Sequence, residues 1–183
     1  TPDKDEIREN QAESNGHRWG KQIFFMGIAI LGIGLFWMQK DHYKAYQQWN
    51  KAQMFYNNKA YEAALEVYEP LYPLLKHKPE FLFEAAQSLS KTGQYEKANE
   101  YLERAVLLSS DPMLYYVMAK NEQCLGEYRQ AEKHLLHAID ILPERIYPYY
   151  LLMNLYTEPS YFQPAKLKMA IDSVLTKKPK VES

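Results

Sequence analysis

The distribution of charged and apolar residues divides the chain into parts of different character. Residues 1–18, TPDKDEIRENQAESNGHR, are polar without apolar periodicity, so we expect a disordered tail or loop there. Residues 22–38, QIFFMGIAILGIGLFWM, contain no charged side chain, and we expect an apolar helix over residues 19–39. Polar and apolar residues mix over residues 40–178, which predicts a folded domain, followed by a short tail over residues 179–183.

The folded part repeats one pattern of small and aromatic residues. The stretch TGQYEKANEYLERA begins at Thr92, and LGEYRQAEKHLLHA begins 33 residues later at Leu125. In these two stretches Gly93, Tyr95, Ala98 and Ala105 recur as Gly126, Tyr128, Ala131 and Ala138. The matching pairs in an earlier copy and in a degraded later copy are Tyr61 with Ala64 and Phe162 with Ala165.

A period of 33–34 residues, with two helices in each unit, resembles the tetratricopeptide repeat. The resemblance implies helical hairpins over residues 45–78, 79–111, 112–145 and 146–178. Because one hairpin cannot bury its own apolar face, such units stack side by side. We therefore predict an all-α fold, a right-handed α-solenoid of about eight antiparallel helices without strands.

The repeated residues have structural roles in such a fold. Alanines such as Ala64 and Ala98 allow paired helices to approach closely. We expect a buried ring, wedged between helices, at the positions that follow the turns, Tyr61, Tyr95 and Tyr128. Gly93 and Gly126 supply a permissive turn backbone, whereas Lys59 replaces the glycine in the first unit and predicts a looser turn.

Prolines mark two departures from the repeat. Pro70 and Pro73 fall within the second helix of the first unit, where a proline costs about 3 kcal/mol or more. We expect that helix to kink or to stop near Glu69. Pro164 suits the first turn of the last helix, which is predicted to cap the array.

The uncharged segment has the character of a membrane helix. It spans about 25 Å, slightly less than a hydrocarbon core of roughly 30 Å, and Lys21 can extend it by snorkelling. Trp19 and Trp37 lie where interfacial aromatic residues are found. A buried soluble helix and a signal peptide are the alternatives, although no small-x-small cleavage site follows. Since no Gly or Pro lies between Leu35 and Lys59, the helix is predicted to run unbroken into the repeats.

Basic residues flank both ends of this segment almost equally. The N-terminal side has Lys4, Arg8, Arg18 and Lys21, and the other side has Lys40, Lys44 and Lys51. The bias is therefore small, although Arg18 and Lys21 favour a cytoplasmic N-terminal side.

Composition argues against several kinds of chemistry. The formal net charge is −1, from 22 basic and 23 acidic residues, so we expect no nucleic-acid partner. Cys124 is the one cysteine, which excludes an internal disulfide and a cysteine-based zinc site. His134 and His137 are interpreted as part of a solvated helix face. We find no nucleophile with a base and no phosphate-binding loop, and expect no catalytic residue, metal or cofactor in this chain.

In a repeat of this kind, binding is expected in the concave groove lined by the first helix of each unit. The repeat register places aromatic residues, amides and lysines there, a set that suits an extended peptide or a glycan. The candidates are Trp49, Gln53, Tyr56, Phe83, Gln87, Lys91, Tyr116, Lys120, Gln123, Tyr150 and Asn154. The alternative is that these rings only pack between helices. Chaperone-binding tetratricopeptide domains clamp a C-terminal carboxylate with Lys and Asn, where this chain has Glu84 and Val117, so we expect no such clamp.

A more specific resemblance rests on KAQMFYNNKAYEAALEVYEPLYPLLKHKPEFLFEAAQSLSKTGQYEKANE, RIYPYYLLMNLY and VLTKKPKVES. The chain is also predicted to have a last membrane span, then a short helical joint, then four repeat units. These stretches and this order are similar to the C-terminal region of O-antigen ligase-family membrane proteins of Gram-negative bacteria. The resemblance covers residues 19–183 and implies the accessory part of a glycosyltransferase that moves glycan from an undecaprenyl-diphosphate carrier to a lipid A core. No catalytic position of the family has a counterpart here.

Two functional hypotheses therefore stay open. In the first, the chain is the accessory tail of a glycan ligase, which the missing N-terminal Met and the abrupt end at KVES favour. In the second, it is a stand-alone, membrane-anchored tetratricopeptide adaptor of a bacterial envelope complex. In both, we expect one span in the bacterial inner membrane, repeats on the periplasmic side, and a protein or glycan ligand in the groove.

Overall fold

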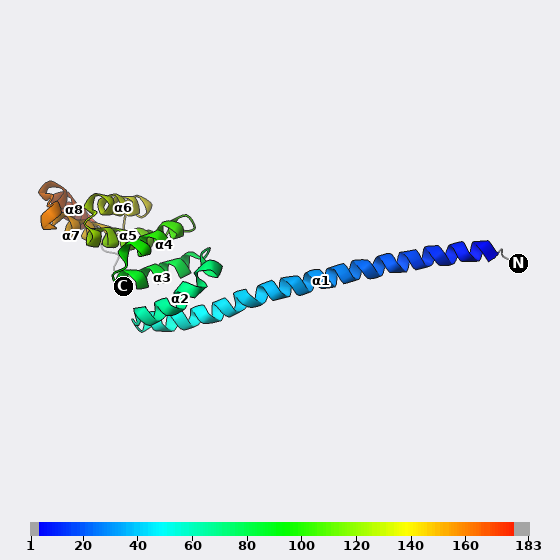
Figure 1. The fold of residues 1–183 in the computed structure, drawn as a ribbon. Coiled ribbons are helices and arrows are strands. Elements are labelled where there is room, and N and C mark those ends of the chain that lie inside the picture. Colours follow the sequence, from blue (N-terminus) through cyan, green and yellow to red (C-terminus); the bar gives the residue numbers. More distant parts are fainter. Residues whose placement is uncertain (1–3, 178–183) are drawn as a thin grey trace, which may run out of the picture. The chain divides into compact units, whose positions relative to one another are not determined.

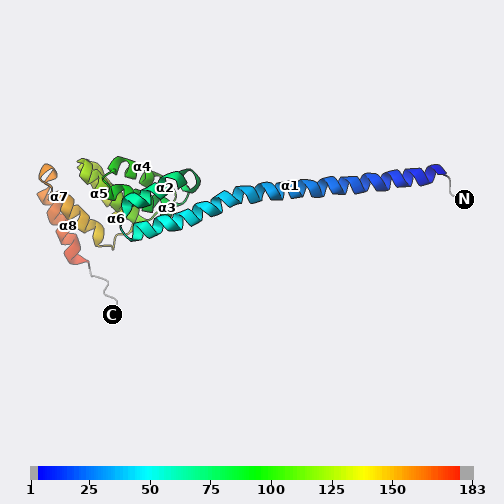
Figure 2. The same ribbon diagram turned by 60° about the horizontal axis from the view of Figure 1, so that its bottom comes forward.

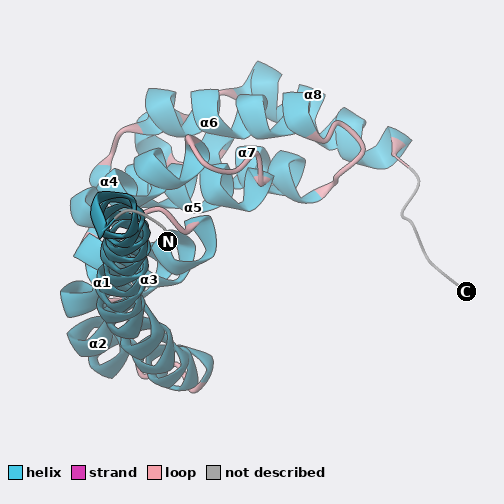
Figure 3. Cartoon of the chain, turned by 90° about the vertical axis from the view of Figure 1, so that its right-hand side faces the viewer, coloured by secondary structure: helices cyan, strands magenta, loops and turns pink. Residues whose placement is uncertain are grey.

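The computed structural model of the chain describes residues 4–177, and within them the side chains of residues 24–36 and 40–177. Every regular element of the described part is a helix, and no strand occurs in it (Figure 1, Figure 3). The elements are α1 (Lys4–Asn57), α2 (Tyr61–Leu75), α3 (Pro79–Lys91), α4 (Tyr95–Val106), α5 (Pro112–Leu125), α6 (Tyr128–Ile141), α7 (Tyr147–Tyr156), a short 3-10 helix (Pro159–Tyr161) and α8 (Pro164–Thr176). The all-α prediction is confirmed. The predicted tail over residues 179–183 lies outside the described residues.

The chain divides into two compact units, Thr1–Tyr46 and Gln47–Ser183. The described part of the first unit is helical throughout, including residues 4–18, which were predicted to be a disordered tail or loop. The correction follows from composition, because Glu, Gln, Arg and Ala favour helix and no proline follows Pro2 before Pro70. Helix α1 is continuous to Asn57, as the lack of Gly and Pro after Leu35 predicted.

Apolar side chains of α1 between Phe24 and Phe36 are exposed, with exposed fractions of 51% to 69% among the large ones. Within the described residues, one helical segment, Phe24–Asn57, is long enough and apolar enough to cross a membrane. Signal sequences and core helices of soluble proteins share this length and composition, so the segment is a candidate span by these two criteria only.

The second unit is a stack of helical hairpins. Each helix from α2 to α8 packs against the next one along the chain, and α5 also contacts α3 and α7 (Figure 2). The first helices of successive hairpins therefore lie side by side. Alanines at the helix contacts have no exposed surface, and these include Ala52, Ala64, Ala86, Ala98 and Ala131. Such side chains let the paired helices approach closely.

The first three turns between paired helices share one backbone conformation. Gly93 and Gly126 have φ angles of 81° and 79°, and Lys59 adopts 61° in the equivalent place. The amide of the next residue donates to a carbonyl five residues back, at 2.9 Å for Ala60, 2.9 Å for Gln94 and 2.8 Å for Glu127. The prediction of a looser first turn is therefore wrong, because the hydrogen bonds of the turn hold Lys59 in the left-handed region.

The prolines of α2 do not end the helix. It continues from Tyr61 to Leu75 and contains both Pro70 and Pro73, so of the predicted kink or stop near Glu69, the stop is wrong. Both prolines lie on the exposed face, where water can satisfy the carbonyl groups that lose their amide partners. The opposite face, with Tyr68, Leu71 and Leu75 buried, pairs with the stack.

The tyrosines after the turns are less buried than predicted. Tyr61, Tyr95 and Tyr128 are all half-buried, because each begins a helix at the edge of the stack. The fourth unit departs further. Phe162 is 58% exposed and Ala165 is also exposed, so they do not replace the tyrosine and alanine of the other units. The extra turn at Pro159–Tyr161 changes the register, and α8 begins at Pro164 as predicted.

Candidate binding groove

The eleven predicted groove residues come from the C-terminal part of α1 and from α3, α5 and α7. The structure divides them into a hydrogen-bonded group, a group that lines a cavity, and a remainder, and Gln87 belongs to both of the first two groups. The first two groups lie at different places along α3, which supplies Glu84 to one and Lys91 to the other.

Glu84, which was not among the candidates, is the centre of the hydrogen-bonded group. Its carboxylate accepts from Trp49 Nε1 at 2.6 Å, from Gln53 Nε2 at 2.8 Å and from the Tyr68 hydroxyl at 3.0 Å. The Tyr56 hydroxyl donates to the side-chain carbonyl of Gln87. These candidates therefore hold neighbouring helices together through polar groups that are already satisfied.

Ring packing and electrostatics reinforce this group. The rings of Trp49 and Tyr68 both pack edge-on against Phe81, with centroids 5.7 and 5.5 Å apart. Burial, and then the negative charge of Glu84, raises the pKa of Tyr68 and of Tyr56 above the ordinary tyrosine value. Both hydroxyls therefore stay protonated and act as donors at neutral pH.

The second group lines a cavity of about 400 Å³ between α3, the start of α4, α5 and α7. Gln87, Lys91, Tyr116 and Lys120 are predicted candidates that line it. The other lining residues are Ser90, Tyr95, Met113, Val117, Asn121, Cys124, Tyr147 and Leu151. We call this the central cavity.

Tyr95 and Cys124 line the cavity but were not among the groove residues predicted from the sequence. Helical spacing alone could have indicated Cys124. Tyr116, Lys120 and Cys124 are four residues apart and form one row along α5. Cys124 is exposed, and a hydrogen bond that the Tyr95 hydroxyl donates to its sulfur is the main cause of a raised Tyr95 pKa. Tyr147 packs edge-on against Tyr116, with centroids 5.2 Å apart.

The remaining candidates do not join either group. Phe83 lines a smaller cavity of about 250 Å³ together with Glu80 and Asp111. Gln123 donates to Glu158 at 2.8 Å. Tyr150 and Asn154 are exposed on α7.

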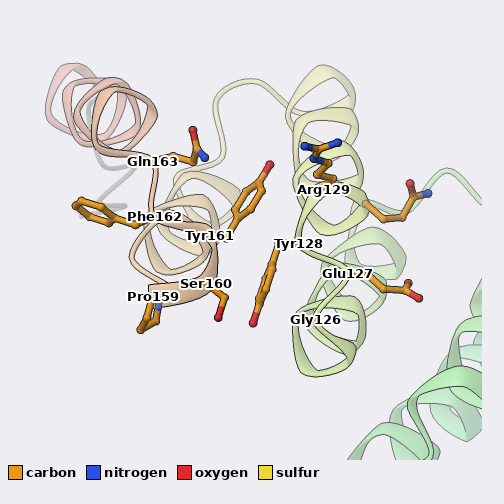
Figure 4. A pocket seen from close by; sticks show the side chains of 10 residues that line it. Gly126, Glu127, Tyr128, Arg129, Pro159, Ser160, Tyr161, Phe162 and Gln163 are labelled. Atoms are coloured by element: carbon orange, nitrogen blue, oxygen red, sulfur yellow. The ribbon is translucent and has the colours of Figure 1, made fainter.

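Further cavities lie outside the groove, and two of them border the last hairpin. One, of about 940 Å³, lies between the α5–α6 turn and residues 159–163, where Tyr128 and Tyr161 stack with centroids 5.5 Å apart (Figure 4). Because these rings cover each other, they leave little aromatic face for a ligand. The other, of about 420 Å³, is formed by α6, α7 and α8 and is mostly apolar.

The interpretation of His134 as part of a solvated face is wrong. Its Nδ1 lies 2.9 Å from the Glu122 carboxylate, and the side chains are 16% and 4% exposed. The two residues belong to paired helices, so stacking of α5 on α6 buries both. His137 is exposed and packs edge-on against Tyr115 at 4.7 Å between centroids. Among the described residues, no group of three His, Cys, Asp or Glu side chains is placed to hold a metal ion.

Comparisons with known proteins agree with this architecture. The family model described as anaphase-promoting complex, cyclosome, subunit 3 matches residues 57–138. No curated protein gives a significant match to the chain.

Among solved structures, MamA from Desulfovibrio magneticus RS-1, from its residue 41 to its end, is 18% identical, with a TM-score of 0.63 over 72% of this chain and 72% of that one. The Yersinia enterocolitica type III secretion chaperone SycD, in complex with a peptide of the translocator YopD, is 19% identical, with a TM-score of 0.54 over 69% and 91%. The first tetratricopeptide domain of Spaghetti (RPAP3), bound to the HSP90 peptide SRMEEVD, is 15% identical, with a TM-score of 0.56 over 61% and 89%. The fold is thus a tetratricopeptide-type helical repeat.

Proposed function

We propose that the second unit is a protein-interaction module that holds an extended peptide of a partner in the groove, with the central cavity as its main contact. The observation that carries the proposal is the cavity itself. It combines aromatic and aliphatic side chains with polar groups on four helices, α3, α4, α5 and α7. SycD with its YopD peptide and RPAP3 with its HSP90 peptide support the same use of a similar fold.

The single cysteine allows a direct test, because Cys124 lines the cavity and is exposed. A photoreactive benzophenone is attached to Cys124 in the full chain, and crosslinked partners are identified by mass spectrometry. The control has Cys124→Ser with Glu103→Cys, which moves the label to the exposed side of α4. We expect a partner to crosslink from position 124 and not from position 103. Equal crosslinking from both positions would contradict binding in the groove.

We also propose that residues 19–39 anchor the module in the bacterial inner membrane, with the repeats on the periplasmic side. The uncharged stretch and its exposed apolar side chains support this. Membrane fractionation after alkaline carbonate extraction, followed by protease treatment of spheroplasts, tests both parts. A chain that is released by carbonate has no spanning helix, and repeats that resist protease in intact spheroplasts are not periplasmic.

On the sequence resemblance, we propose that the chain is the accessory C-terminal part of an O-antigen ligase-like glycosyltransferase, and that the groove then docks a partner or presents glycan during surface-glycan assembly. The alternative is a stand-alone membrane-anchored adaptor of an envelope complex. The reading frame upstream of Thr1 separates the two, because the ligase requires further apolar spans there. The chain alone is expected to lack glycan transfer from a lipid-linked donor. Detectable transfer would mean that residues assigned here to packing carry out chemistry.

A further inference from the structure

We propose that the central cavity selects an acidic peptide segment, whose carboxylates are held by Lys91 on α3 and Lys120 on α5. This inference rests on the proposed peptide-binding function and names the class of peptide. The occupant is an extended segment of a partner protein in which acidic residues alternate with apolar ones.

The first argument is the charge of the lining. Lys91 and Lys120 both line the cavity, and none of the other residues around it is acidic. Both lysines are exposed. Neither forms an ion pair with any residue that the structure describes, whereas Lys97, Lys166 and Lys177 each do. The cavity therefore presents two ammonium groups whose charge no carboxylate neutralises.

The helix dipole favours only one of these lysines. Lys91 lies in the last turn of α3, where the helix dipole favours a cation. Lys120 lies in the interior of α5, whose last turn contains no basic residue. The helix dipole therefore does not account for Lys120, which lines the same cavity as Lys91.

The second argument is the apolar surface between the charges. Met113 is 41% exposed and Tyr147 is 51% exposed at the cavity, beside the nearly buried ring of Tyr116. Such a surface suits an apolar or aromatic side chain of a peptide. In an extended segment, successive side chains point to opposite sides. The acidic side chains can therefore contact the lysines while the apolar ones contact this surface.

The neighbouring cavity fixes where the acidic residues can lie. Its acidic lining residues include Glu80 in the first turn of α3 and Asp111 just before α5, whereas Lys91 lies in the last turn of α3. Glu80 and Lys91 are separated by about 16 Å along α3. Like charges there repel an acidic peptide, so its carboxylates are restricted to the lysine end.

The test compares three pools of fluorescein-labelled peptides of about ten residues, the length that an extended segment needs to cross the groove. Alternate positions carry Leu, Val, Phe or Tyr, and the others are all Glu, all Gln or all Lys. Binding to the full chain, kept in mild detergent, is followed by fluorescence anisotropy. The rate of Cys124 alkylation, with and without each pool, reports whether the cavity is covered.

We expect the Glu pool to bind about tenfold more tightly than the Gln pool, to slow Cys124 alkylation, and to weaken strongly at about 0.5 M salt. The double variant Lys91→Gln with Lys120→Gln should bind the Glu pool as weakly as the Gln pool. The matched control, Lys133→Gln with Lys168→Gln, removes the same charge from exposed positions outside the cavity and should leave binding unchanged.

The other outcomes separate the two proposals. Equal binding of the Glu and Gln pools, with Cys124 protected by both, overturns acidic selection and leaves the peptide groove standing. Tight binding of the Glu pool that neither protects Cys124 nor depends on the two lysines places the site elsewhere and overturns this inference. If no pool binds or protects Cys124, the inference of an acidic peptide is wrong. The Cys124 crosslinking experiment alone then tests whether the groove binds a peptide.

Discussion

Two parts of one groove are built from similar residues and used in opposite ways. Around Glu84, an indole, an amide and a phenol all donate to one carboxylate, and these side chains tie α1, α2 and α3 together. Around Lys91 and Lys120, cationic and aromatic side chains border an open cavity of about 400 Å³. Aromatic and polar residues at groove positions therefore do not identify a binding site by themselves. What distinguishes the two parts is whether the polar groups satisfy one another.

The largest effect is expected in the hydrogen-bonded group around Glu84, which we call the closed part of the groove. Glu84→Ala leaves the buried hydroxyl of Tyr68 and the half-buried donors of Trp49 and Gln53 without this acceptor and should lower the free energy of unfolding by about 2–4 kcal/mol. Urea unfolding followed by circular dichroism measures this. Glu80→Ala, one turn earlier and exposed, is the control and should change stability by about 0.5 kcal/mol or less. A similar loss in both variants would remove Glu84 from its central role.

The part of the groove around the central cavity is called the open part. A slightly smaller loss of stability is expected on the face of α5 that points away from this cavity. Helix α5 forms one wall of the central cavity and on another face pairs Glu122 with His134. His134→Leu leaves the Glu122 carboxylate nearly buried without its partner, which should cost about 2–3 kcal/mol. His137→Leu, on the exposed side of α6, serves as the matched control in the same unfolding assay. Equal stability of the two variants would show that the buried pair contributes little.

A third effect should depend on pH. Burial alone would raise the pKa of Glu132, but hydrogen bonds from Lys166, Tyr156 and Tyr161 outweigh it and hold the pKa below the ordinary value of 4.5. The folded pKa is thus lower than the unfolded one. The stabilisation is present above about pH 4.5 and is lost as the pH falls through the folded value.

Glu132→Gln should therefore lower stability by about 1 kcal/mol at neutral pH, and by much less in acid. Unfolding of both proteins over a series of pH values tests this. Hydrogen bonds from the last hairpin to Glu132 hold this hairpin against α6, and the hairpin supplies Tyr147 and Leu151 to the central cavity. The variant therefore also shows how far this side of the cavity depends on the position of the hairpin. A difference between the proteins that stays constant with pH would contradict the assigned pKa shift.

The repeat was predictable because its determinants are local. Tyr95, Ala98 and Gly93 recur at a fixed spacing, and each acts within its own hairpin or turn. Helix continuity through α1 followed equally from the absence of Gly and Pro. The helix does not stop near Glu69, one of the two predicted outcomes there, because the cost of a helix proline depends on whether its face is exposed, which the local sequence did not reveal.

The division of the groove was not predictable from register alone. The register placed Trp49, Gln53 and Tyr56 correctly on first helices, but their partners Glu84 and Gln87 lie 31 to 35 residues away along the chain. Tyr68, the third donor to Glu84, comes from a second helix that register assigns to the other layer. Only stacking of the hairpins brings these groups within hydrogen-bonding distance. The spacing of four residues from Tyr116 through Lys120 could have added Cys124 to the candidates.

The central claim is that the closed part supports the fold and the open part binds the ligand. The most direct test measures stability and affinity for the Glu peptide pool in the same two variants, at a temperature where both are folded. Glu84→Ala should lose about 2–4 kcal/mol of stability and keep its affinity within about twofold. Lys91→Gln with Lys120→Gln should keep its stability within about 0.5 kcal/mol and lose about tenfold in affinity. The reverse pattern, with affinity lost on replacing Glu84 and kept on replacing the lysines, would contradict the account.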